Sequence, residues 1–337
     1  MNNDIYPWLA PAWNRLSAQW RQLPHALLIH GRSGLGKTVL ARRYAQRVLC
    51  EGDPAGELPC GQCASCRWFG QGNHPDFRLV EPAALAPPAA DDERPRGDKE
   101  SASRQIRIDQ IREVQDFLAI GTHRRGWRVV LIRPAEAMNP ATANALLKSL
   151  EEPPPGTLFL LVSSSPERLA ATIRSRCQQL AVPAASPAEA EGWLAQQSVR
   201  EPRAALAYSG NAPLAALDAE EDRSAREALL ARLAEGAPAP LELADACQGI
   251  APGTVIGWLQ RWAYDLARAR LAGTVRFHVR QAPAVRAVAD RLPTGALLRF
   301  EQSLAGDLAV AEHPLNPRLF LESVFLRYAQ LWEPRHG

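Results

Sequence analysis

The segment Gly31-Arg32-Ser33-Gly34-Leu35-Gly36-Lys37-Thr38 has the residue types and spacing of a phosphate-binding P-loop. Its glycines, Gly31, Gly34 and Gly36, let backbone N–H groups turn inward around phosphate oxygens, and the helix that follows adds its dipole. Lys37 would bridge the β- and γ-phosphates, and Thr38 would offer its hydroxyl to Mg²⁺. The loop predicts bound ATP or ADP, against the alternative of a glycine-rich turn without a ligand.

The acids that a P-loop ATPase needs for hydrolysis are missing from their expected place. In such enzymes a second apolar strand ends in acidic residues that hold the Mg²⁺ shell and orient the attacking water. The matching run here, residues 129–132, ends in Arg133 and Pro134, and neither side chain can hold Mg²⁺ or act as a base. Glu136 lies beyond them and would need an unusual loop to substitute. We therefore expect a site that holds nucleotide without intrinsic ATPase activity.

Four of the six cysteines lie within 17 residues, in the spacing C-x9-C-x2-C-x2-C: Cys50, Cys60, Cys63 and Cys66. A C-x2-C turn places two thiolates on one side of a cation, and four thiolates suit tetrahedral Zn²⁺. An iron–sulfur cluster shares part of this spacing but is expected to have its fourth cysteine downstream, beside a proline; free thiols are a third reading. Four cysteine ligands leave no open coordination position, so we expect a structural Zn²⁺ ion.

The elements that must position these residues alternate over the first 180 residues between short apolar runs and helical patterns, as in a parallel α/β sheet. The expected strands are residues 26–30, 77–80, 127–132, 157–162 and 178–182. The expected helices between them include residues 37–49, 108–118 and 143–150. After residue 183 the strand signal disappears and amphipathic helices follow, including residues 292–311 and 318–331. The predicted fold class is α/β followed by all-α.

The same patterns predict three domains. An α/β P-loop domain spans residues 1–182 and contains a four-cysteine zinc module at residues 50–66. Residues 81–104 are rich in Pro and Ala and then highly charged, without periodicity, and are expected to form a disordered loop. A small helical lid is expected at residues 183–220, and a larger helical domain at residues 221–337.

Composition and charge limit the functional classes. Of the 337 residues 46% are hydrophobic and 22% charged, as in a soluble globular protein. No run reaches the roughly 18 apolar residues of a transmembrane helix, so we expect no membrane partner. Residues 1–7 lack the features of a signal peptide, so we expect a cytoplasmic location. The net charge of +3 is too small for a histone-like nucleic-acid binder.

Several motifs occur together in an order that resembles the bacterial clamp-loader family of AAA+ proteins, which load the sliding clamp for the replicative DNA polymerase. They are the P-loop, the four-cysteine module, Asn144-Ala145-Leu146-Leu147-Lys148-Ser149-Leu150-Glu151-Glu152-Pro153-Pro154 and Ser175-Arg176-Cys177. The similarity is dense over residues 24–180 and weaker in the helical part. It implies that residues 221–337 form the collar of a hetero-pentameric ring with gamma/tau and delta subunits. The sliding clamp and primed DNA would be reached through this complex.

Two kinds of subunit share these motifs. Motor subunits (gamma/tau) keep Asp-Glu where this sequence has Arg133-Pro134, and a sensor arginine where it has Pro213. Both losses favour the delta-prime type, a scaffold of the ring, although some delta-prime subunits have a degraded P-loop and this one is intact. The alternatives are an ATP-hydrolysing motor subunit that uses Glu136, and an unrelated AAA+ nucleic-acid remodeller.

The resemblance also implies a role for Arg176. In the family, the arginine of Ser-Arg-Cys reaches the γ-phosphate of ATP on the neighbouring motor subunit as a trans arginine finger. A planar, permanently charged guanidinium suits this role because it stabilises charge on the transferring phosphoryl group. An ordinary surface salt bridge is the alternative.

Two further polar groups are open to more than one interpretation. Residues 163–165, three serines, occupy the place of the family's polar sensor residue, but serine after a strand is also ordinary turn chemistry. A basic cluster, His123, Arg124, Arg125 and Arg128, could meet a DNA backbone. We expect it to be a solvated loop.

Overall fold

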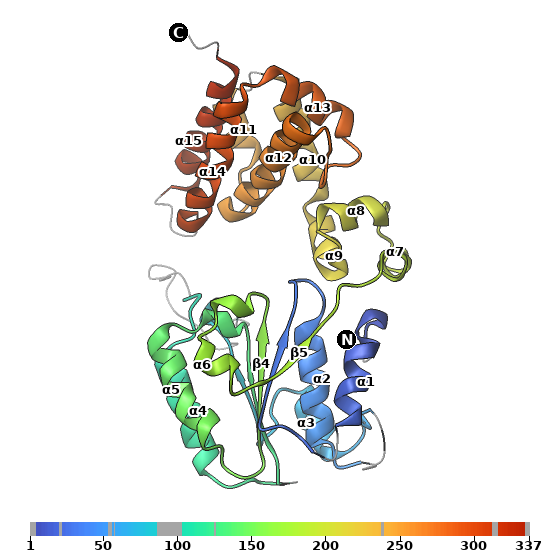
Figure 1. Cartoon of the computed structure of the whole chain (residues 1–337), viewed down its shortest axis with the longest axis vertical. Coiled ribbons are helices and arrows are strands. Elements are labelled where there is room, and N and C mark those ends of the chain that lie inside the picture. Colours follow the sequence, from blue (N-terminus) through green and yellow to red (C-terminus); the bar gives the residue numbers. More distant parts are fainter. Residues whose placement is uncertain are drawn as a thin grey trace. The chain divides into compact units, whose positions relative to one another are not determined.

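The computed structural model describes residues 5–19, 22–52, 56, 58–85, 103–124, 126–236, 239–311 and 316–333. The chain forms two compact units, Met1–Ser186 and Pro187–Gly337 (Figure 1). The first contains a parallel sheet and the second is helical, which confirms the predicted fold class. The helices expected to form a lid belong to the second unit. None of the helices in the described parts of the chain has the length and apolar character needed to span a bilayer.

The sheet of the first unit has five parallel strands in the order β2-β3-β4-β1-β5. They are β1 (Ala26–His30), β2 (Phe77–Val80), β3 (Arg128–Ile132), β4 (Thr157–Ser163) and β5 (Gln178–Ala181). All five were expected from the sequence. The central strands β3 and β4 are buried along their whole length, and burial on both faces explains their uninterrupted apolar runs.

Helices cover both faces of this sheet. They are α1 (Ala10–Ala18), α2 (Lys37–Leu49), α3 (Ala64–Gly70), α4 (Ile108–Ala119), α5 (Pro140–Glu151) and α6 (Ala171–Arg174). Figure 1 shows α4 and α5 on one side and α1, α2 and α3 on the other. Leu28, Val130 and Phe159 pack toward α4 and α5 in one hydrophobic cluster. The first unit is therefore a three-layer α/β domain.

Short 3-10 turns connect several of these elements. They are η1 (Pro7–Leu9), η2 (Ala83–Leu85), η3 (Ala135–Ala137) and η4 (Pro166–Arg168). Most of the loop expected to be disordered, residues 81–104, lies outside the described residues. In its described part, η2 forms and the side chain of Glu81 is only 9% exposed.

The second unit is built from helices, most of which contribute to one hydrophobic cluster that extends from Tyr208 to Leu331. They are α7 (Pro187–Gln196), α8 (Pro202–Tyr208), α9 (Pro213–Glu221), α10 (Arg223–Glu235), α11 (Pro240–Ala246), α12 (Pro252–Ala272), α13 (Ala282–Arg291), α14 (Thr294–Val310), α15 (Pro317–Ala329) and the 3-10 turn η5 (Gln330–Trp332). Many begin with proline, whose fixed φ and missing N–H suit the first helical position. In the core, Trp262 Nε1 donates to Tyr328 Oη at 3.1 Å.

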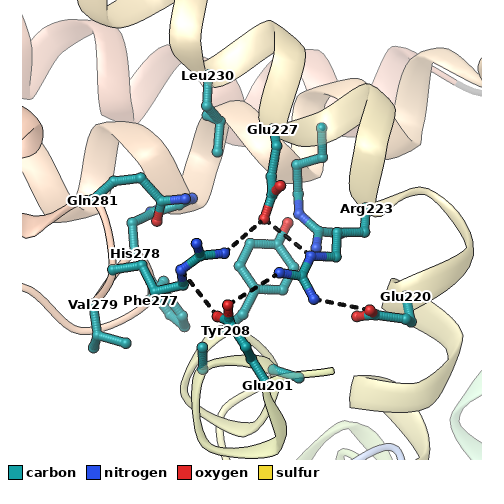
Figure 2. Close-up of a pocket in the computed structure, with 14 residues that line it drawn as sticks. Glu201, Tyr208, Glu220, Arg223, Glu227, Leu230, Phe277, His278, Val279 and Gln281 are labelled. Atoms are coloured by element: carbon teal, nitrogen blue, oxygen red, sulfur yellow. Dashed lines mark hydrogen bonds and ion pairs between the residues drawn. The ribbon is translucent and has the colours of Figure 1, made fainter. Parts of the chain in front are cut away.

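An ion-pair network joins α8 and α9 to α10 and to the segment before α13 (Figure 2). Arg223 pairs with Glu220 at 2.9 Å and with Glu227 at 3.0 Å. Arg280 pairs with Glu201, at the start of α8, at 2.9 Å. Single exposed pairs contribute little, but pairs that share partners restrain one another. The network links α8 and α9 to the rest of the second unit.

Buried Asp265 holds the segment after α12 in place. Its side chain is fully buried, and its carboxylate accepts the backbone N–H groups of Arg276, Phe277 and His278 and a hydrogen bond from His278 Nδ1 at 2.9 Å. Burial alone would raise the pKa of Asp265, but these hydrogen bonds bring it below its ordinary value. The negative charge of Asp265 therefore stabilises the folded unit.

We expect Asp265→Asn to lower the free energy of unfolding by about 2–3 kcal/mol at neutral pH, because it weakens several charge-assisted hydrogen bonds. Since the folded-state pKa lies below the unfolded value, this stabilisation is present above the unfolded pKa and is lost as the pH falls through the folded pKa. Urea unfolding as a function of pH measures it. The exposed Asp290→Asn is the control, and equal stabilities for the two variants would contradict the assignment.

Candidate functional site

The P-loop lies between β1 and α2, as its motif requires. Gly31 and Gly36 have φ values of +146° and +85°, a region that favours glycine. A Cβ at Gly31 would lie 2.7 Å from the carbonyl oxygen of Val182, so this position also lacks room for a side chain. Gly34 also has a positive φ, of +74°. The three glycines therefore form the turn that opens α2.

Lys37 is the first residue of α2 and its side chain is 5% exposed. Its Nζ donates to the carbonyl oxygen of Arg32 at 2.6 Å and to Ser164 Oγ at 3.0 Å. Burial lowers the pKa of Lys37, and the charge of Glu136 acts against this by raising it. The ammonium group thus contacts both the loop and the residue that follows β4. Thr38 comes next in the first turn of α2 and is partly exposed.

At the end of β3 the structure has an arginine that is already paired. Arg133 Nη2 lies 2.5 Å from Glu81 Oε2, and Glu81 directly follows the neighbouring strand β2. The charges of this pair also act on Arg42 of α2. Burial is the main cause that lowers the pKa of Arg42. The charge of Arg133 lowers this pKa further, and the charge of Glu81 raises it. Two guanidinium groups and one carboxylate therefore occupy the region where P-loop ATPases carry their acidic residues.

Glu136 lies closer to the P-loop than its place in the sequence suggests. The chain passes a cis Arg133–Pro134 peptide bond and forms the turn η3. Glu136 Oε1 then accepts the backbone N–H of Ser164 at 2.9 Å. Because Ser164 also contacts Lys37, one serine connects Glu136 to the P-loop lysine. Sequence reasoning identified Glu136 but not the short turn that brings it back, which has no periodic signal.

The four cysteines come together as predicted. Their sulfur atoms all lie within 4.8 Å of one another, and the Cys50–Cys63 and Cys60–Cys66 pairs are each separated by 4.0 Å. A tetrahedral ion with metal–sulfur bonds of about 2.3 Å needs sulfur atoms about 3.8 Å apart. Backbone N–H groups of Cys60, Cys63 and Cys66 also point at cluster sulfurs, at 3.3 to 3.4 Å. The donor set and its geometry therefore fit one tetrahedral metal ion.

The two other cysteines are ordinary buried thiols. Cys177 lies in the first unit and Cys247 in the second, and both are buried. Desolvation raises the pKa of each to about 11, so both remain protonated at neutral pH. Neither belongs to the cluster.

The cysteine module is fixed to the domain by the loop between α4 and β3. Arg124 forms an ion pair with Glu51, next to Cys50, and its guanidinium lies 4.7 Å from the ring centroid of Trp68 in α3.

Arg128 is buried and donates to the carbonyl oxygen of Leu118 at the end of α4. The prediction of a solvated loop is therefore wrong for Arg128, which is buried. Arg124 has a specific partner, Glu51. Arg125 lies outside the described residues.

A buried histidine adds a second attachment of the module. Asp76 donates its backbone N–H to His74 Nδ1 at 3.0 Å, which leaves the ring proton on Nε2, 2.7 Å from Ser65 Oγ. Ser65 donates in turn to the carbonyl oxygen of Leu49 at 2.5 Å. Burial lowers the pKa of His74, in keeping with a neutral ring. Nothing in the spacing of these residues indicates this contact.

Arg176 lies between α6 and β5 with 35% of its side chain exposed. One Nη atom is 2.5 Å from Glu151 Oε1 at the end of α5, and the other donates to the carbonyl oxygen of Thr172 at 2.9 Å. Its polar contacts within the described residues are with α5, α6 and Ser175, and not with the P-loop. Among the described residues, Arg176 therefore makes no polar contact with the P-loop of its own chain.

A parallel sheet with a P-loop after β1, inside the order β2-β3-β4-β1-β5, defines an AAA+ type of P-loop domain. The profile of the family described as "DNA polymerase III, delta subunit" matches residues 11–186. The chain is 32% identical over 315 residues to DNA polymerase III subunit delta' of Yersinia pestis, covering 89% of this chain and 87% of the relative. The chain therefore belongs to the DNA polymerase III delta' subunit family.

Other relatives match over shorter stretches. DNA polymerase III subunit delta' of Pseudomonas aeruginosa is 42% identical over 217 residues, which are 63% of this chain and only 60% of the relative. Among solved structures, a DNA polymerase III gamma subunit-related protein of Thermotoga maritima is 17% identical, with a TM-score of 0.42 over 95% of this chain and 99% of its own.

We expect the purified chain to contain about one tetrahedral metal ion, because four cysteines complete one site. Cys60→Ser should release the ion and lower the melting temperature, since metal binding contributes directly to folding. Metal analysis and thermal unfolding with and without a strong chelator measure both effects. Cys247→Ala, outside the cluster, should keep its metal. A folded, metal-free wild type that is unaffected by the chelator would contradict the assignment.

Proposed function

We propose that the chain is a delta'-type subunit of a clamp loader, a scaffold that helps to load the sliding clamp onto primed DNA. Its family membership supports this role, and the observation that carries it is the paired Arg133 at the end of β3. A cation held by Glu81 at this place cannot ligate Mg²⁺, and Pro134 offers no base. The chain is therefore proposed to hold ATP or ADP in its P-loop without hydrolysing it.

The partners of the proposed subunit are gamma/tau and delta in a hetero-pentameric ring, with residues 221–337 as the collar that holds the ring. Relatives named DNA polymerase III subunit tau, from Bacillus subtilis and Escherichia coli, support shared ancestry with the proposed partners. The clamp and the primed DNA are reached through the assembled complex. The four cysteines hold a structural Zn²⁺ ion, since four thiolates in tetrahedral geometry suit zinc.

Arg176 is proposed to act on the neighbouring subunit's ATP as a trans arginine finger. Its side chain is partly exposed and is held by Glu151, whose own side chain is 47% exposed. An ion pair between exposed groups in water is weak, so Arg176 can exchange this carboxylate for a phosphate. A guanidinium at the γ-phosphate would then stabilise the charge that develops during transfer.

A second candidate is an ATP-hydrolysing motor subunit of the gamma/tau type. The contact between Glu136 and Ser164, which itself binds Lys37, favours it, because an acid does lie beside the P-loop. Steady-state ATPase of the isolated chain separates the two candidates. Robust turnover would support the motor subunit, and no turnover would support the scaffold.

We expect Arg176→Ala to lower the ATPase rate of the reconstituted complex by about 10- to 1,000-fold, since an arginine finger stabilises the transition state. Complex assembly, followed by size-exclusion chromatography, should be unchanged. The matched control is Arg168→Ala. Arg168 is an exposed arginine in η4, which like Arg176 lies in the connection between β4 and β5. Full ATPase activity of the Arg176 variant in an intact complex would rule out the finger, and equal loss in both variants would indicate a general interface defect.

A further inference from the structure

Glu136 is attached to the P-loop site by specific contacts. Its Oε1 accepts the N–H of Ser164 at 2.9 Å, and the hydroxyl of the same serine accepts a hydrogen bond from Lys37 Nζ at 3.0 Å. Parallel pairing brings these groups together, because β1, β3 and β4 are neighbours and their carboxyl ends lie at one edge of the sheet. A carboxylate thus stands beside the lysine that the P-loop motif assigns to phosphate.

The second carboxylate oxygen of Glu136, Oε2, is buried and makes no hydrogen bond with any residue that the structure describes. A buried carboxylate oxygen without a donor is unfavourable, and such oxygens are commonly satisfied by water or by a cation. Carboxylate oxygens are preferred ligands of Mg²⁺ and of the waters in its first shell.

The neighbouring carboxylate at this edge is already paired with an arginine. Arg133 and Glu81 pair with each other at 2.5 Å, so Glu81 is engaged by a guanidinium and is not free to face a cation. The charge of Glu136 instead acts on Lys37. A nucleotide bound in the loop would bring several negative charges near this carboxylate, and a divalent cation bound with it would offset their repulsion.

We propose that Glu136 makes nucleotide binding by this P-loop dependent on Mg²⁺, in place of the acids that are missing at the end of β3. The proposal rests on the proposed binding of ATP or ADP and concerns binding alone. Glu136 would supply negative charge that attracts an Mg²⁺ ion bound together with the nucleotide. Thr38, in the first turn of α2, supplies the hydroxyl that the motif assigns to the same ion. Without Mg²⁺, Glu136 repels the phosphates.

The test measures ATP affinity of the isolated full-length chain by calorimetry, in excess Mg²⁺ and in EDTA. For the wild type we expect Mg²⁺ to tighten binding by roughly tenfold or more. Glu136→Gln should bring the two affinities to within about threefold of each other and should bind metal-free ATP more tightly than the wild type does. Circular dichroism and the melting temperature check that this variant folds.

Two control variants define the site. Glu167→Gln removes an exposed carboxylate three residues beyond Ser164 and should behave as the wild type. Lys37→Ala should lose ATP binding under both conditions, which places the measured binding in the P-loop.

The proposal is overturned if Glu136→Gln keeps the wild-type ratio of the two affinities, or if the wild type binds ATP equally with and without Mg²⁺. Absence of any ATP binding by the wild type also overturns it. That result leaves the scaffold function standing, because the scaffold is tested separately through Arg176 in the assembled complex.

Discussion

The parallel pairing of β3, β4 and β1 is the constraint on which the geometry of the P-loop and its neighbours depends. Parallel strands end at the same edge of a sheet, so the residues that follow them meet there even when they are distant in sequence. Lys37 and Ser164 are 127 positions apart and form a hydrogen bond. Since these strands are buried on both faces, a shifted register would place polar strand ends in the core. The core and the site are therefore held by the same pairing.

Two of the cations at this edge have a carboxylate nearby. Arg133 forms an ion pair with Glu81, and burial lowers the pKa of Lys37 while the negative charge of Glu136 raises it. Such pairing gives Arg133, at the end of β3, a carboxylate partner in its half-buried position. A P-loop domain can therefore carry an arginine at the end of this strand without an uncompensated charge.

Much of this fold could be predicted from the sequence, because the strands are uninterrupted apolar runs and α2 begins directly at Lys37. The cysteine cluster was also predictable, since C-x2-C spacing fixes the local turn. The return of Glu136 through η3 and the contact of Glu81 with Arg133 were not, because they depend on tertiary pairing of irregular segments. The burial of Arg128 was missed for a related reason: a guanidinium binding carbonyl groups at a helix end has no signature in the sequence.

Helix α2 connects the P-loop to the four-cysteine cluster. The P-loop opens its first turn, and Cys50 is the residue that caps its last. Thirteen residues separate the phosphate loop from the cysteine cluster by about 20 Å of rigid helix. Inserting or deleting one residue would rotate Cys50 by about 100° relative to Lys37 and move the sulfur away from its three companions. The length of α2 thus fixes the orientation of Cys50 relative to the P-loop, and this helix should tolerate substitutions far better than changes in length.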